Sequence, residues 1–246
     1  MNAIERNAQP SADFDAKLQQ ALRTLRDAAA AHPGRIVQST SLGAEDMVIT
    51  DLIARHRLAI PLATLDTGML HDETLALIER ISQHYGIAVE VFAPPQRSVI
   101  EFVERHGPDA MYQSVELRKA CCALRKLEPL GRLMQGRDAW VTGLRREQSS
   151  DRAAVELREA ESNGRIKWSP LADWHWGDVW HYIALQQVPY NPLHDRFYPS
   201  IGCAPCTRAI AQGEDFRAGR WWWEQEGAKE CGLHAHAHVH ALPVAP

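Results

Sequence analysis

The chain has 246 residues, of which 45% are hydrophobic and 24% are charged, and its formal net charge is -4. This composition is that of a globular protein and excludes a disordered or fibrous chain. The acidic balance argues against a nucleic-acid partner held on a broad basic face. No apolar run approaches the ~20 residues that cross a bilayer, and the first residues lack the apolar stretch of a secretory signal. We therefore expect a cytoplasmic protein with no membrane or nucleic-acid partner.

Strand-like and helix-like segments alternate along the first three quarters of the chain. Short buried apolar runs predict strands at 35–41, 61–65, 87–92 and 138–143. Apolar residues at helical spacing predict helices at 12–31, from Gly43 onward, at 71–84 and at 176–187. Repeated strand–helix alternation is typical of a parallel sheet covered by helices. The predicted fold class is α/β: one domain with a twisted parallel sheet and flanking helices.

The character of the sequence changes near residue 188. Pro, Gly, aromatic and basic residues dominate from there to residue 234, with little periodicity. We interpret residues 1–187 as an α/β core and 188–246 as an irregular C-terminal segment that folds over the sheet. Alternating histidines near the end could bind a metal adventitiously, but a solvated tail is the preferred interpretation of the last three.

Two polar loops follow predicted strands at the edge of the sheet where α/β proteins bind ligands. The first contains Ser39, Thr40, Ser41, Gly43, Glu45 and Asp46, and the second contains Leu65, Asp66, Thr67 and Gly68. Small hydroxyl residues and glycine let backbone N–H groups face an anion. Each loop alone could be a turn and helix cap. Two of them on neighbouring strands favour a nucleotide crevice.

Basic residues occur in groups beside cysteines and after predicted strands. They are Arg118, Lys119, Arg125, Lys126, Arg145, Arg146, Arg217 and Arg220. Singly, each is best explained as a surface charge. Together, they lie where a phosphate or sulfate would need partners.

Five cysteines exclude a complete set of internal disulfides. Cys121 and Cys122 are adjacent, and Cys203 and Cys206 form a C-x-x-C pair, so four thiolates could hold one metal centre. Adjacent cysteines suit the spread corners of an iron–sulfur cluster better than a structural zinc ion. Zinc remains an alternative on spacing alone, and buried free cysteine is the non-functional interpretation.

The fifth cysteine, Cys231, lies between Lys229 and His234 near the C-terminus. A lone cysteine there is normally incidental. Neighbouring cations would favour its thiolate, which makes it a candidate nucleophile.

In combination these segments resemble the assimilatory sulfonucleotide reductases, specifically the iron–sulfur adenosine 5'-phosphosulfate reductases. The resemblance spans about residues 39–234 and rests on STSLGAEDMV, LDTGMLHDET, GPDAMYQSVELRKACCALRKLEPL, VTGLRREQS, WSPLADWHWGDVWHYI, VPYNPLHDRFYPSIGCAPCTR and KECGLH. The same fold group, the adenine nucleotide alpha hydrolase-like proteins, includes ATP pyrophosphatases with a glycine-richer phosphate loop. The loop at 41–46 departs from that pattern, which favours a substrate that is already activated.

The resemblance implies roles for particular residues. A [4Fe-4S] cluster would be bound by Cys121, Cys122, Cys203 and Cys206, and Cys231 would be the nucleophile on a mobile C-terminal segment. Contacts to the phosphosulfate would come from Lys126, Arg217, Arg220 and His234. The nucleotide would lie among the loop at 39–46, the loop at 65–68, and Gly143, Arg145 and Arg146.

The implied reaction is thioredoxin-dependent reduction of adenosine 5'-phosphosulfate to sulfite and AMP through an S-sulfocysteine, in assimilatory sulfate reduction. Glutaredoxin could replace thioredoxin, and the chain could form a homo-oligomer. Three alternatives stay open: a reductase that takes the 3'-phosphorylated nucleotide or both nucleotides, a zinc-stabilised nucleotide-binding protein, and an iron–sulfur tRNA-modifying enzyme.

Overall fold

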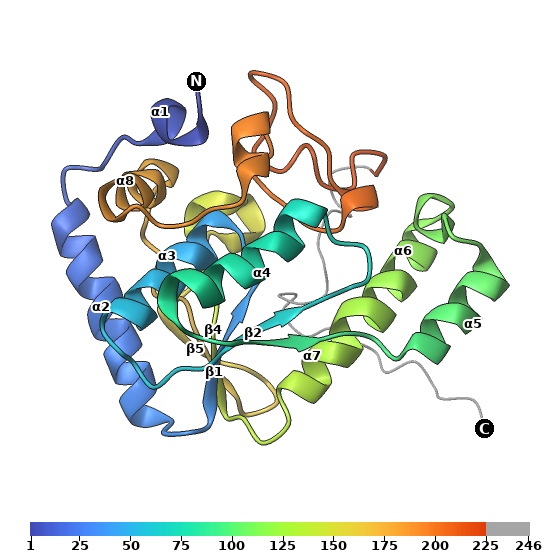
Figure 1. Ribbon diagram of the computed structural model, residues 1–246, viewed down its shortest axis with the longest axis horizontal. Helices are drawn as coiled ribbons and strands as arrows, with labels where there is room; N and C mark the ends of the chain where they lie inside the picture. The colour runs from blue at the N-terminus through green and yellow to red at the C-terminus, as the bar shows by residue number, and fades with distance from the viewer. Residues whose placement is uncertain (225–246) are drawn as a thin grey trace.

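The structure, a computed structural model, describes residues 1–224 and contains one six-stranded sheet (Figure 1). The strand order is β3-β2-β1-β4-β6-β5. The strands are β1 (Ile36–Thr40), β2 (Leu62–Leu65), β3 (Val89–Phe92), β4 (Ala139–Val141), β5 (Arg158–Ala160) and β6 (Ile166–Trp168). All four predicted strands are present, and they pair in parallel as expected.

The sheet departs from the prediction at one edge, where β5 runs antiparallel to β6. The two strands are joined by a tight connection in which Gly164 adopts a φ of 82°. A connection this short can join only antiparallel neighbours, because a parallel pair needs a long crossover. The predicted parallel sheet is confirmed for the central strands, and the antiparallel edge is an addition that was not predicted, because each strand of the hairpin is too short to show periodicity.

Eight α-helices surround the sheet within residues 1–224. They are α1 (Ala3–Asn7), α2 (Phe14–Ala31), α3 (Ala44–Arg55), α4 (Asp72–Tyr85), α5 (Gln96–His106), α6 (Val115–Cys122), α7 (Glu128–Leu133) and α8 (Trp176–Gln186). The predicted helices correspond to α2, α3, α4 and α8. The others were not predicted: α1, α6 and α7 are short, and α5 buries none of its residues.

Alternate residues of the central strands face two separate cores, as strand geometry requires. Ile36 and Leu62 belong to the larger core, which also contains residues of α2, α3, α4 and α8. Val37, Ala63 and Trp140 point the other way and pack against α7. Helices therefore cover both faces, which leaves the carboxyl edge of the strands for binding.

An arm of helices joins the sheet at this edge and carries the first cysteine pair. Helix α6 ends at Cys122 and passes directly into a π-helical turn, η2 (Ala123–Leu127), and then into α7. A π turn widens the helix locally and is often found at functional sites. Here it carries Arg125 and Lys126, which are both buried.

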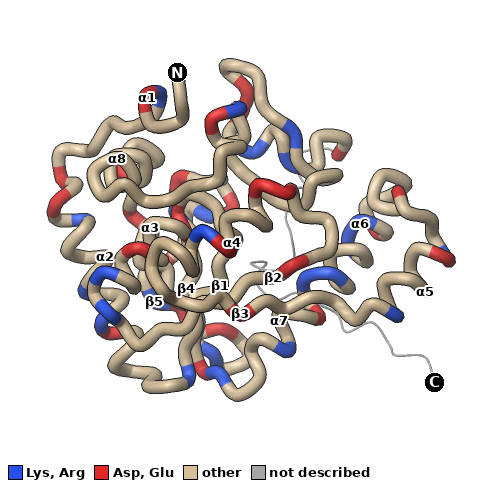
Figure 2. Tube along the Cα trace, viewed as in Figure 1, with Lys and Arg blue, Asp and Glu red and all other residues tan. Residues whose placement is uncertain are grey.

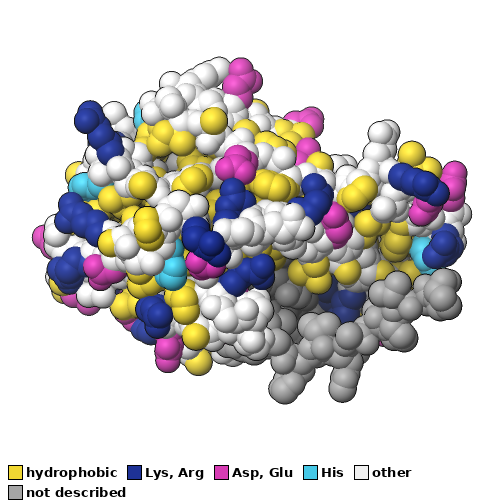
Figure 3. All heavy atoms as spheres, turned by 90° about the horizontal axis from the view of Figure 1, so that it is seen from below, with side chains coloured by type: hydrophobic (Ala, Val, Ile, Leu, Met, Phe, Trp, Pro, Cys, Tyr) yellow, Lys and Arg dark blue, Asp and Glu magenta, His cyan; other side chains and the backbone are white. Residues whose placement is uncertain are grey.

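The segment after α8 crosses the carboxyl edge of the sheet (Figure 1). It includes the short helical turns η5 (Pro192–Arg196) and η6 (Ala204–Cys206). The backbone of Cys203 forms an isolated antiparallel β-bridge with that of Leu70, which follows β2. No helix within residues 1–224 is both long and apolar enough to cross a membrane. On the face shown in Figure 3, Lys and Arg side chains are dispersed among acidic ones.

Candidate functional site

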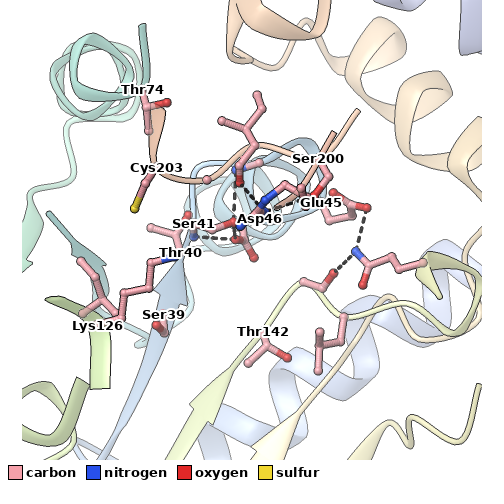
Figure 4. A pocket seen from close by; sticks show the side chains of 18 of the residues that line it. Ser39, Thr40, Ser41, Glu45, Asp46, Thr74, Lys126, Thr142, Ser200 and Cys203 are labelled. Carbon is pink, nitrogen blue, oxygen red and sulfur yellow. Dashed lines mark hydrogen bonds between the residues drawn. The ribbon is translucent and has the colours of Figure 1, made fainter. Parts of the chain in front are cut away.

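A cavity of about 200 Å³ lies at the carboxyl ends of β1, β2 and β4. Its walls come from the loops after these strands, from the π turn and from the C-terminal segment (Figure 4). The position follows from the topology. The strand order places β1 between β2, which follows it in the chain, and β4, which comes later, and α/β sheets bind ligands in the crevice where the strand order reverses in this way. We call this cavity the main pocket.

The β1–α3 loop forms the floor of the main pocket through a network centred on Asp46. The backbone N–H and hydroxyl of Ser41 both donate to Asp46 Oδ2 at 2.6 Å. Leu42 takes a left-handed φ of 63°, and its N–H donates to Thr40 Oγ1. Burial raises the pKa of Asp46 to about 6, although the Ser41 hydrogen bonds oppose that rise. Asp46 Oδ1 is buried against Gly143, whose backbone N–H also counters the rise in the pKa of Asp46.

Glu45 is held beside Asp46 by residues that follow β4. Arg145 Nε donates to Glu45 Oε1 at 3.0 Å, and Gln148 Nε2 donates to the same atom at 2.9 Å. Arg145 is only 1% exposed and also pairs with Glu147 at 2.7 Å. Its guanidinium does not line the pocket itself but holds Glu45, which does. Gly143 is required at the end of β4, because a Cβ there would collide with Asp46.

The β2–α4 loop joins the main pocket to the second cysteine pair. Asp66 Oδ1 accepts the Gly68 N–H at 2.8 Å, which closes a turn in which Gly68 has a φ of 68°. Thr67 Oγ1 lies 3.2 Å from Cys203 Sγ. Thr67 also accepts, through its carbonyl oxygen, a hydrogen bond from Arg125 Nη1 at 2.8 Å. This loop is thus tied to both cysteine-bearing segments.

Among the described residues, four cations line the main pocket, and three of them, Lys126, Arg217 and Arg220, come from the π turn and the C-terminal segment. Figure 2 shows basic residues on both the α6–α7 arm and the C-terminal loops. Arg220 donates to Ser200 Oγ and to the Ile201 carbonyl at 3.3 Å, and a Cβ at Gly202 would collide with its guanidinium. Lys and Arg side chains that line a partly enclosed cavity bind phosphate and sulfate groups well. The main pocket is therefore suited to an anionic ligand.

A second, smaller cavity contains all four cysteines of the two pairs. Cys121, Cys122, Cys203 and Cys206 are buried and unbridged, and they line it together with Met69, Met111, Arg118, Arg125 and Lys126. We call it the thiol cavity. Lys126 lines both this cavity and the main pocket. Cys203 also lines both, so these two residues lie at the boundary between the cavities.

The chemistry of the thiol cavity fits an anionic, sulfur-rich group. Burial raises the pKa of Cys121 and raises that of Cys206 to about 12, and Arg125 and Lys126 respectively counter these shifts. Arg125 Nε and Trp221 Nε1 are buried donors without partners within residues 1–224. No group of three His, Cys, Asp or Glu side chains in the same range is arranged to hold a single metal ion. Four buried cysteines that line one cavity are the ligand type that soft metal ions and iron–sulfur centres take, so the residues present fit such a group.

Most of the predicted substrate-binding residues come together in the main pocket. Those that line it are Ser39, Thr40, Ser41, Gly43, Glu45, Leu65, Thr67, Lys126, Gly143, Arg217 and Arg220. Asp66, Gly68, Arg145 and Arg146 do not line it. Arg146 is turned away and pairs with Asp173 and the Val155 carbonyl. Cys231 and His234 lie outside the described residues.

Several lining residues were given no individual role in the prediction. Thr64, Thr142, Arg152, Ser200 and Trp221 line the main pocket, as does Asp46 of the predicted loop at 39–46, and Arg118 and Arg125 of the basic groups line the thiol cavity. Asp46 had a signal in the sequence, since it lies in the same polar loop as Glu45. Thr64 and Thr142 also had one, because each lies at the carboxyl end of a predicted strand. Ser200 lies in an irregular segment where spacing carries no such information.

Comparison with known proteins agrees with this geometry. A family model described as "Phosphoadenosine phosphosulfate reductase domain" matches residues 35–209. A protein from Allochromatium vinosum named adenosine 5'-phosphosulfate reductase is 58% identical over 200 residues, which cover 81% of this chain and 78% of that protein. A protein of the same name from Burkholderia cepacia is 54% identical over 197 residues, covering 80% of this chain and 79% of that one.

Solved structures agree as well. The crystal structure of phosphoadenylyl-sulfate reductase from Candida auris in a phosphate complex has a TM-score of 0.66 at 28% identity, covering 83% of this chain and all of that chain. FMN adenylyltransferase from Candida glabrata, at 16% identity and a TM-score of 0.53, shares the fold, with 93% of this chain and 81% of that chain covered. The family model and the identities to curated relatives confirm the expected resemblance: the chain belongs to the phosphoadenosine phosphosulfate reductase family.

Proposed function

We propose that this chain reduces adenosine 5'-phosphosulfate to sulfite and AMP in sulfate assimilation. The observation that carries the proposal is that Lys126 lines both the nucleotide-sized main pocket and the thiol cavity. The names and identities of the relatives support the same substrate.

The two ends of the main pocket suggest how the substrate lies. Lys126, Arg217 and Arg220 would receive the phosphosulfate, since cations stabilise its charge most strongly in a partly enclosed site. The nucleoside would lie toward the β1–α3 loop, whose residues Ser41, Gly43 and Glu45 line the pocket. Ser39, Thr40, Thr142 and Leu65 would surround it (Figure 4).

Cys231 would carry the covalent step. Its thiolate attacks the sulfate sulfur, an S–S bond forms, and the bond from that sulfur to the phosphate oxygen breaks so that AMP leaves. A thiolate and a phosphosulfate repel each other, and the three cations reduce that repulsion and stabilise the charge that builds on the departing phosphate. His234, from the same segment as Cys231, would add a further contact to the phosphosulfate.

Reduced thioredoxin, or glutaredoxin, would complete the turnover. One thiolate of the reductant attacks Cys231 Sγ, and sulfite leaves with the electron pair of the S–S bond. The second thiol of the reductant then resolves the mixed disulfide and returns Cys231 as a thiolate. The two electrons thus come from the dithiol, which leaves as a disulfide.

We further propose that Cys121, Cys122, Cys203 and Cys206 hold a [4Fe-4S] cluster in the thiol cavity. When bound, the cluster would supply electrostatic tuning of the adjacent site and a cross-link between the α6–α7 arm and the C-terminal segment. Lys126 would orient its ammonium group between the cysteines and the phosphosulfate, and Arg125 would hold the β2–α4 loop in place. Zinc in the same place is the alternative that metal analysis decides.

The direct test is sulfite release by anaerobically purified protein with reduced thioredoxin. Adenosine 5'-phosphosulfate and its 3'-phosphorylated form are offered separately at equal, limiting concentration. We expect a strong preference for the form without the 3'-phosphate, about four iron atoms per chain, and no sulfite from Cys231→Ser although it still binds nucleotide. Preference for the 3'-phosphorylated form would instead identify that nucleotide as the substrate. No sulfite from either nucleotide in iron-replete protein would refute the proposal.

A further inference from the structure

The last described residue, Glu224, is joined to the helix that carries the first cysteine pair. Arg118 Nε donates to Glu224 Oε1 at 2.8 Å, and Arg118 Nη2 donates to Glu224 Oε2 at 2.7 Å. The two side chains are 1% and 2% exposed. This is a buried, two-pronged ion pair between segments that are far apart in the sequence. None of the pocket contacts described above explains it.

Trp221 links this ion pair to the main pocket. Its indole ring contacts the Arg118 guanidinium at 4.8 Å and the Arg220 guanidinium at 4.7 Å from the ring centre. The ring is 1% exposed and packs with Cys122, Cys203 and Cys206. Arg118 lines the thiol cavity, whereas Arg220 lines the main pocket. A single aromatic ring therefore lies against cations from both sites.

The backbone at Trp221 is held in an unfavourable conformation. Its φ is 40°, in the left-handed region that bulky residues avoid. Its N–H donates to the Cys206 carbonyl at 3.2 Å, and its own carbonyl accepts the Glu224 N–H at 2.9 Å. Strain of this kind persists where the surrounding contacts impose it, and it is concentrated at functional sites. The turn at 221–224 is therefore set by its contacts with the cysteine-bearing segments.

A buried ion pair is a weak source of stability, because the desolvation of both groups offsets their attraction. Well-packed apolar side chains would serve as well for holding two segments together. What the two-pronged geometry adds is orientation, since a planar guanidinium fixes a carboxylate in one plane and at one distance. The arrangement thus favours a positioning role.

We propose that Arg118, Trp221 and Glu224 form an anchor that positions the C-terminal segment for the reaction of Cys231. The inference rests on the proposed function and deepens it. Cys231 follows Glu224 by seven residues, and seven residues span at most about 25 Å when fully extended. The anchor fixes Glu224, the point from which the chain continues to Cys231, against the helix that carries Cys121 and Cys122.

The test compares variants at Glu224 with a control on the same segment. Glu224→Ala removes the carboxylate, and Glu224→Gln keeps an acceptor without the charge. Glu214→Gln is the matched control, because Glu214 forms a two-pronged pair with Arg208 at 2.8 Å that is about one-third exposed. Each protein is mixed once with adenosine 5'-phosphosulfate without reductant, and the S-sulfo adduct on Cys231 is followed by mass spectrometry. AMP affinity and iron per chain are measured in parallel.

We expect Glu224→Ala to form the adduct about 10- to 100-fold more slowly, because misplaced reacting groups lose rate steeply. AMP affinity and iron content stay as in the wild type, Glu224→Gln is intermediate, and Glu214→Gln stays within about twofold. An adduct rate unchanged in Glu224→Ala would overturn the proposal. So would a loss of AMP affinity or iron in proportion to the rate, since that would assign Glu224 to general structural support.

Hydrogen exchange separates a failure of the anchor from a failure of the proposed function. If the wild type forms no adduct, the proposed chemistry is wrong, and the anchor is judged by exchange alone. We expect faster exchange at the Trp221 and Glu224 amides of Glu224→Ala, with unchanged exchange in β1. Unchanged exchange at both amides would overturn the anchor whatever the reaction proves to be.

Discussion

The two ends of the main pocket are built in different ways. At the carboxylate end, Glu45 and Asp46 lie in the first turn of α3, and Ser41, the partner of Asp46, lies in the loop just before it. At the cationic end, Lys126 comes from the π turn, whereas Arg217 and Arg220 come from the C-terminal segment. Local sequence brings the two acidic residues of the first end together, and distant residues then hold Glu45, whereas tertiary packing alone brings the cations together.

This difference suggests how the work is divided. The carboxylate end is pre-organised, since Arg145, Gln148 and Ser41 hold its acidic groups before any ligand binds. The cationic end depends on the docking of the C-terminal segment over the sheet. Substitutions at the carboxylate end should therefore change the free energy of unfolding, whereas substitutions at the cationic end should lower the rate of turnover.

Arg145→Ala gives the largest expected loss of stability. The change leaves Glu45 without its buried cation, and removal of one partner of a buried pair costs about 3–5 kcal/mol. Chemical denaturation of the purified protein measures the free energy of unfolding. A stable variant with a raised KM would instead show that Arg145 contacts the substrate.

Lys126→Gln tests the cationic end. We expect kcat/KM for adenosine 5'-phosphosulfate to fall about 10²–10³-fold, the loss typical of removing one stabilising donor from a reaction centre. Lys119→Gln is the control, because Lys119 is an exposed cation on the same arm. Equal activity of the two variants would remove Lys126 from the mechanism.

Asp46→Asn tests the pH dependence of the carboxylate end. Burial raises the pKa of Asp46 to about 6, above its ordinary value of 3.8. Ionisation therefore weakens the fold as the pH rises through this window, and the amide should be more stable by up to about 3 kcal/mol at pH 7 but not at pH 3.5. Denaturation curves at both pH values measure the difference. Equal stability of the two proteins at pH 7 would contradict it.

The pKa of His194 is shifted in the direction opposite to that of Asp46, so its effect on stability has the opposite dependence on pH. Burial lowers the pKa of His194 to about 4, so the unfolded chain binds more protons than the native one between about pH 4 and 6.5. The contribution of His194 to the free energy of unfolding should therefore fall as the pH decreases through this window. Because Asp46 acts in the opposite direction, we expect Asp46→Asn to have a steeper dependence than the wild type.

Asp138→Asn should have the smallest effect. Asp138 pairs with Arg35 at the opposite edge of the sheet, where both side chains are about half exposed. Exposed pairs contribute little because water and salt screen them. Unfolding and sulfite-release assays should both match the wild type, and a clear loss of activity would show coupling across the sheet.

The sequence predicted the parts of the molecule that depend on local pattern. The strands and helices around Ser41 and Thr67 show clear periodicity, and topology then places their loops together. The β5–β6 hairpin and the π turn leave no such pattern, because each depends on tertiary contacts. Arg145 illustrates the limit for the site: its place after β4 predicts the pocket, but only packing decides that its guanidinium faces Glu45.

The central claim is that Lys126 and its partner cations direct the sulfate of a sulfonucleotide to Cys231. The most direct measurement is mass spectrometry of the anaerobic protein after one equivalent of adenosine 5'-phosphosulfate, with AMP measured in the same sample. We predict one SO3 adduct on Cys231 for each AMP released, and loss of both in Lys126→Gln. AMP release without an adduct, or an adduct on another residue, would contradict the account.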